Sequence, residues 1–60
     1  MTNKENILNV LTENWKSTTK VAQDLATNYY IAINLLYELQ REDKIEKLEI
    51  GAKKYWRKKI

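Results

Sequence analysis

The chain has 60 residues and a formal net charge of +3, and it contains neither Cys nor His. That composition excludes disulfides and thiolate or imidazole metal sites, and it removes the commonest general base. No apolar run approaches the ~18 residues of a membrane span, and the polar start MTNKENIL does not resemble a signal peptide. We therefore expect one small, non-enzymatic cytoplasmic domain without a cofactor or small-molecule ligand.

The positive charge is concentrated at the C-terminal end of the chain. Residues 51–60 contain five of the eleven cations and no acid, so residues 1–50 carry six cations together with all eight acids. A solvated surface usually mixes the two signs, and a segregated basic segment indicates a polyanionic partner such as nucleic acid. The alternative is a tail that only increases solubility.

A first amphipathic helix is predicted over residues 3–14. Thr2 and Glu5 have the spacing of a capping box, and Asn14 can end the helix in the left-handed conformation. Apolar residues recur every three or four positions, as on the buried side of a helix. They are Ile7, Leu8, Leu11 and Trp15.

A second, shorter helix is predicted over residues 18–26. The preceding residues 15–17 suit a short extended segment, and Ser17 or Thr18 can cap the helix. Its inward positions are Val21, Ala22 and Leu25.

The third and longest helix is predicted over residues 29–42, after a tight turn in which Thr27 or Asn28 is the cap. Asp43 ends it, because Asp tolerates the left-handed region better than most residues. The inward positions are Ala32, Leu35, Leu36 and Leu39. The outward positions are Tyr29, Tyr30, Ile33, Asn34, Tyr37 and Arg41.

From Ile45 onward the apolar period shifts toward two, which predicts an antiparallel hairpin over residues 45–59 with its turn at Gly51. Trp56 on the second strand is expected to pack near Trp15 and close a small sheet over the first helix. The whole chain, residues 1–60, thus forms a single α+β domain of three helices followed by a hairpin.

This order of elements resembles the winged helix-turn-helix DNA-binding domains. The resemblance is carried by VAQDLATNYYIAINLLYELQREDKI, residues 21–45, whose apolar positions match those of the family's second and third helices. It implies that the third helix is a recognition helix in the major groove of double-stranded DNA, a groove about 12 Å wide. It also implies that the hairpin is a basic wing on the phosphate backbone.

Candidate DNA contacts follow from this resemblance. Asn34 can pair with adenine, Ile33 can meet a thymine methyl, and lysines can neutralise phosphates. The tyrosines have an alternative role in core packing, and Arg41 has one in an ion pair with Glu38 or Glu42. The complete candidate set is Lys20, Asn28, Tyr29, Tyr30, Ile33, Asn34, Tyr37, Arg41, Lys53, Lys54 and Arg57.

A weaker resemblance points to the Zα domains, which bind left-handed Z-form duplexes. Within LLYELQR, Tyr37 falls on their recognition tyrosine, and Trp56 can serve as their wing tryptophan. Two features depart from that pattern. Ile33 stands where those domains have a phosphate-binding asparagine, and residues 53–55 stand where they usually carry paired prolines.

The function expected from the sequence is sequence-specific binding of double-stranded DNA by a small transcriptional regulator. A domain of this size contacts few base pairs, so we expect a homodimer. The Asn-, Lys-, Ile- and Tyr-rich composition suits a viral or plasmid gene, and the protein would then act at the nucleoid or inside a host cell. Two alternatives remain open: a protein-interaction adaptor that uses the tyrosines and Ile33, and an architectural or RNA-binding protein that relies on charge.

Overall fold

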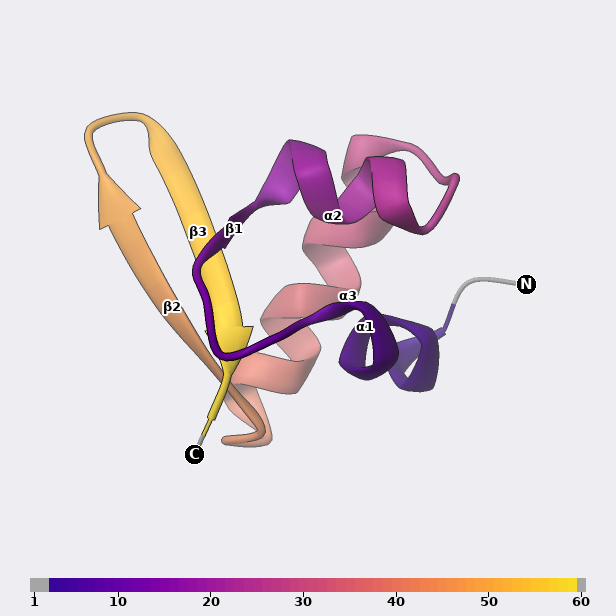
Figure 1. The fold of residues 1–60 in the computed structure, drawn as a ribbon, viewed down its shortest axis with the longest axis horizontal. Helices are drawn as coiled ribbons and strands as arrows, with labels where there is room; N and C mark the ends of the chain where they lie inside the picture. Colours follow the sequence, from indigo (N-terminus) through magenta and orange to yellow (C-terminus); the bar gives the residue numbers. More distant parts are fainter. Residues whose placement is uncertain (1–2, 60) are drawn as a thin grey trace.

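Figure 1 shows the computed structural model, which describes residues 3–59. The predicted α+β layout is confirmed: three helices accompany a small antiparallel sheet in the order of a winged helix-turn-helix domain. The elements are α1 (Lys4–Val10), β1 (Lys16–Ser17), α2 (Thr18–Asp24), α3 (Tyr29–Arg41), β2 (Ile45–Ile50) and β3 (Lys53–Lys58). Within residues 3–59, no helix is both long enough and apolar enough to cross a membrane.

The sheet has the strand order β1-β3-β2, so the last strand of the chain is the central one. The hairpin register pairs Ile50 with Lys53 at the turn, and Ile45 with Lys58 at the other end. Gly51 occupies the turn with a φ of 60°, a conformation that glycine adopts without a steric penalty. β1 pairs antiparallel with β3 through Lys16 and Ser17, which lie in the extended segment predicted before the second helix.

Trp56 on β3 is the centre of the hydrophobic core. Its side chain is fully buried, and its indole Nε1–H donates to the hydroxyl of Thr18 at 2.7 Å. The same hydroxyl donates to the Lys54 carbonyl oxygen at 3.2 Å, which ties the start of α2 to β3. The buried cluster around Trp56 comprises Ile7, Leu11, Val21, Ile33, Leu36, Leu39 and Ile45. Thus side chains from all three helices pack against one side of the sheet.

The first helix is shorter than predicted. It ends at Val10, because the next residue, Leu11, is extended (φ −76°, ψ 148°) and buried in the core. The carbonyl oxygen of Thr12 then accepts a hydrogen bond from the Lys58 N–H at 2.9 Å, which draws the chain to the sheet and leaves Asn14 outside the helix. Trp15 therefore does not belong to the helical stripe.

The cap of the first helix also differs from the prediction. Asn3 is the N-cap, and it exchanges hydrogen bonds with Asn6 in a capping box. The predicted cap, Thr2, lies outside the described residues, and Glu5 takes no part in the box. The box therefore lies one residue later along the chain than predicted, and amide side chains stand at both positions in place of the predicted hydroxyl and carboxylate.

The two turns around α3 agree with the sequence. Asn28 caps the helix by accepting a hydrogen bond from the Ile31 N–H at 2.9 Å, and Asp43 ends the last turn with a φ of 63°. Ala26, between α2 and α3, also has a positive φ of 54°, which is unusual for an alanine. These turns set the angle at which α3 leaves α2 and enters the hairpin.

Candidate nucleic-acid interface

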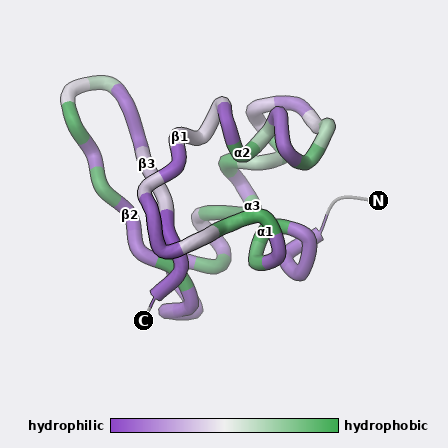
Figure 2. Tube along the Cα trace, viewed as in Figure 1, coloured by the Kyte–Doolittle hydropathy of each residue, from purple (hydrophilic) through white to green (hydrophobic). Residues whose placement is uncertain are grey.

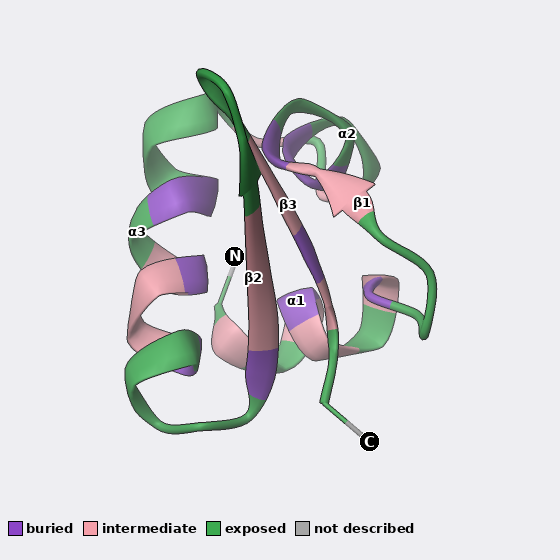
Figure 3. Cartoon of the chain, turned by 90° about the vertical axis from the view of Figure 1, so that its left-hand side faces the viewer, coloured by how far each residue is buried: buried purple, intermediate pink, exposed green. Residues whose placement is uncertain are grey.

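The exposed side of α3 carries four of the eleven predicted contact residues: Tyr29, Tyr30, Asn34 and Arg41. Tyr30 is the most exposed of them at 75%, and Asn34 and Arg41 follow at helical spacing on the same side. Figure 3 shows α3 beside the sheet, with buried segments along the helix and its first and last turns largely exposed. Asn28 is also exposed, although its side-chain oxygen is occupied by the helix cap.

Ile33 does not lie on this exposed side, and its predicted placement is wrong. It is only 9% exposed and belongs to the core cluster, because it stands three residues before the buried Leu36. The outward isoleucine is Ile31, which is 44% exposed and lies three residues before Asn34. The helical spacing could have indicated this. Ile31 stands three residues before the outward Asn34, whereas Ile33 stands three residues before the inward Leu36.

Tyr37 packs beneath the hairpin, so its role is the core packing that the sequence offered as an alternative to a DNA contact. Its ring meets Trp56 edge to face, with centroids 5.4 Å apart, and the Lys47 Nζ lies 5.3 Å from the Tyr37 centroid. This arrangement joins the middle of α3 to both long strands. It also leaves Trp56 without exposed surface, so the residue assigned to the wing of a Zα domain offers nothing to a ligand.

A hollow of about 420 Å³ lies where the hairpin turn approaches the starts of α2 and α3. Figures 1 and 3 agree that these three segments gather at one end of the molecule. The hollow is lined by Ser17, Thr18, Thr19, Tyr29, Ala52, Lys53, Lys54 and Tyr55. It therefore brings together three residues predicted separately from the sequence: Tyr29 of the recognition helix, and Lys53 and Lys54 of the wing.

Ion pairing distinguishes the two wing lysines from most other cations. Acidic partners within 4.0 Å hold Lys4, Lys16, Lys20, Lys44, Lys47, Arg57 and Lys59. Within the described part of the chain, the cations without such a partner are Arg41, Lys53, Lys54 and Lys58. Figure 2 shows β3 hydrophilic along most of its length, and the unpaired charge near the hollow lies at the start of that strand.

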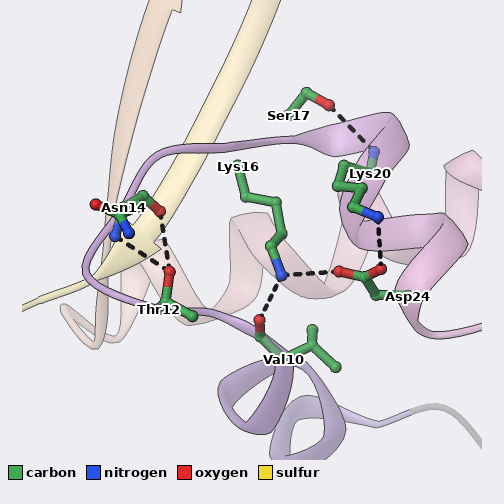
Figure 4. A network of polar contacts seen from close by, with 7 residues as sticks. All are labelled: Val10, Thr12, Asn14, Lys16, Ser17, Lys20 and Asp24. Carbon is green, nitrogen blue, oxygen red and sulfur yellow. Dashed lines mark hydrogen bonds and ion pairs between the residues drawn. The ribbon is translucent and has the colours of Figure 1, made fainter.

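Lys20 is engaged in a network between α2 and the end of α1 (Figure 4). Its Nζ lies 3.2 Å from Asp24 Oδ1, while Lys16 Nζ donates to Asp24 Oδ2 and to the Val10 carbonyl oxygen, both at 2.7 Å. Ser17 caps α2 by accepting from the Lys20 N–H. The charge of Lys20 is thus partly neutralised, and the side chain does not line the hollow.

Arg57 lies on the opposite side of the sheet from the core. Successive side chains on a strand alternate in direction, so Arg57 points away from the side on which Trp56 is buried. Its Nε donates to Glu46 Oε1 at 2.6 Å, and its guanidinium lies 4.4 Å from the centroid of the Trp15 ring. The structure therefore does not bring Arg57 together with Lys53 and Lys54 at the hollow.

Hydrogen bonds from lysines lower the pKa values of three carboxylates. The bond from Lys16, followed by that from Lys20, lowers the pKa of Asp24, and bonds from Lys4 and Lys47 lower those of Glu42 and Glu49. Each pair stabilises the fold above the carboxyl's unfolded pKa, which is 3.8 for Asp and 4.5 for Glu.

We expect the melting temperature to be nearly constant from pH 6 to 8, since the chain has no His to titrate there. It should fall as the pH drops below about 4.5, because carboxylates with lowered pKa values lose their stabilising contribution on protonation. Thermal unfolding followed by circular dichroism at several pH values tests this. A stability maximum below pH 4 would contradict the ion-pair assignments.

The order α-β-α-α-β-β, with a short turn between α2 and α3 and a hairpin after α3, defines a small winged helix-turn-helix domain. The family model described as FaeA-like protein matches residues 3–59, nearly the whole chain. The chain belongs to this FaeA-like family. No curated protein and no solved structure matches it.

Proposed function

We propose that the chain is a sequence-specific double-stranded DNA-binding protein, a small non-enzymatic transcriptional regulator. α3 would enter the major groove, and the turn of the hairpin would lie on the phosphate backbone. The proposal is carried by one observation: the unpaired Lys53 and Lys54 share a hollow with Tyr29 at the start of α3. Membership of the FaeA-like family supports a small regulator-type domain.

The exposed face of α3 supplies chemistry suited to base edges. The Asn34 amide can donate to and accept from adenine in the major groove, and the Ile31 side chain can meet a thymine methyl group. Arg41, which has no acidic partner within residues 3–59, lies further along the helix and suits a phosphate. Because a single α3 covers few base pairs, we propose that two copies bind a two-fold symmetric site.

The function is tested by titrating the protein with a random duplex, an alternating-GC duplex and an RNA hairpin at two salt concentrations. Salt-dependent binding to duplex DNA, with a preferred sequence recovered by selection from a random pool, supports the proposal. Absence of duplex binding refutes it. Inversion of the circular-dichroism spectrum of alternating GC would instead favour recognition of the Z form.

Substitution of Asn34 or Ile31 should change which sequences are preferred. We expect Asn34→Ala to lose about 1–3 kcal/mol on the selected duplex and to relax selectivity at one base pair. Ile31→Ala should abolish the penalty for replacing one thymine by uracil, which lacks the methyl group. Titrating each variant with the selected duplex, with single base-pair changes of it and with a duplex that carries uracil at the thymine position measures these effects.

Asn9→Ala is the matched control, since it removes an exposed helical amide from α1. Its selected sequence should be that of the parent. A base preference that survives in the Asn34→Ala variant would rule out this residue as a base contact.

The protein-interaction alternative rests on the exposed apolar groups of α3. Tyr30 and Ile31 would form a docking face, and the lysines at the hollow would have no role. The same titration separates the two functions, because an adaptor of this kind has no salt-dependent affinity for duplex DNA.

A further inference from the structure

The hollow at the hairpin turn is lined in part by residues whose side-chain donors have no partner among residues 3–59. The residues that line it include three with hydroxyl groups, Thr19, Tyr29 and Tyr55, and two with ammonium groups, Lys53 and Lys54. Within residues 3–59, none of these five side chains makes a hydrogen bond or an ion pair. The hollow is therefore lined mostly by residues that carry a hydrogen-bond donor or a positive charge, and none of its lining residues is acidic.

Lys54 remains unpaired although an acid stands opposite it on the neighbouring strand. Its cross-strand partner is Glu49, whose carboxylate is held by Lys47 at 2.8 Å. The hydrogen bond from Lys47 is the largest cause that lowers the pKa of Glu49, and the positive charge of Lys54 contributes less. The ammonium group of Lys54 is thus available to an anion from outside the protein.

The walls of the hollow are held by other contacts. Thr18 accepts from the Trp56 indole and donates to the Lys54 carbonyl oxygen, which fixes the backbone of β3 against the start of α2. The Tyr29 ring packs edge to face on Tyr30, with centroids 5.7 Å apart. A site with fixed walls loses little conformational entropy when a ligand binds.

We propose that this hollow is a discrete site for one backbone phosphate of the bound duplex, with ligands from Lys53, Lys54, Tyr29 and Thr19. A base edge presents acceptors mixed with donors, whereas a phosphate presents only acceptors and a negative charge, which matches this lining. The inference rests on the proposed function and deepens it, because Tyr29 belongs to α3. A phosphate held there fixes the position of the recognition helix along the groove.

The test uses Tyr29→Phe, which removes one hydroxyl and retains the ring that packs on Tyr30. On a duplex selected with the parent protein, we expect about a tenfold loss of affinity. The slope of log K against log salt should stay unchanged, because no charge is removed. A scan that replaces each phosphate with a neutral methylphosphonate should reveal one position at which Tyr29→Phe has no further effect.

Tyr30→Phe is the matched comparison, since it removes the same group from the neighbouring residue outside the hollow. Any loss of affinity that Tyr30→Phe causes should be the same on the unmodified duplex and on the duplex with a methylphosphonate at the position coupled to Tyr29. If the parent binds duplex DNA but Tyr29→Phe binds equally well, or its loss is uniform across the scan, the phosphate site is refuted while the proposed function stands. If the parent binds no duplex, the proposed function itself fails.

Discussion

Replacing Trp56 with alanine is expected to lower the free energy of unfolding by about 3–5 kcal/mol. The indole is fully buried and contacts Tyr37, and it lies in a hydrophobic cluster to which all three helices contribute. A 60-residue domain has a total stability of about 3–9 kcal/mol, so this variant should be largely unfolded at 37 °C. Urea unfolding followed by far-ultraviolet circular dichroism measures the loss.

Two further variants separate the contributions of the indole. Thr18→Val keeps the shape of the side chain but leaves the Trp56 N–H buried without an acceptor, for an expected loss of about 1–3 kcal/mol. Trp15→Ala is the matched control, because Trp15 is 38% exposed and lies on the other side of the sheet against Arg57. If Trp15→Ala were as destabilising as Trp56→Ala, the assignment of Trp56 to the centre of the core would be wrong.

The order of elements could be predicted because local signals were strong. Helical apolar spacing in residues 29–42, the cap at Asn28, the left-handed Asp43 and the single glycine at the hairpin turn each correspond to an observed feature. The end of the first helix could not be read in this way. Leu11 continues the helical spacing, and only its tertiary contacts and the hydrogen bond from Lys58 to Thr12 make the chain leave the helix there.

The site was less accessible to sequence reasoning for a related reason. Net charge locates a basic segment, but it does not show which cations are paired within the fold. Arg57 binds Glu46 and Lys20 lies beside Asp24, whereas within residues 3–59 Lys53 and Lys54 have no acidic partner within 4.0 Å. Whether a cation of the hairpin has an acidic partner depends on strand register and on the alternation of side chains across the sheet, which are properties of the folded chain.

The largest effect on DNA binding is expected from the double substitution Lys53→Ala and Lys54→Ala. Two lost phosphate contacts should reduce the slope of log K against log salt by about 1.8 and weaken binding about 60-fold at 0.1 M salt. The loss should be similar for all duplex sequences, because contacts to phosphate carry no base information. Fluorescence anisotropy with a selected duplex and a scrambled one, across a salt series, measures both quantities.

The matched control is Lys58→Ala with Lys59→Ala, which removes the same net charge from the opposite end of the hairpin. Lys58 pairs with Ile45 in the strand register and Lys59 binds Asp43, so neither reaches the hollow. A solubilising tail would respond to both double variants alike, since only net charge matters for it. A wing that contacts the backbone through its turn should lose affinity only when Lys53 and Lys54 are removed. Equal losses in the two variants would therefore eliminate the wing contact and leave nonspecific attraction as the role of the basic segment.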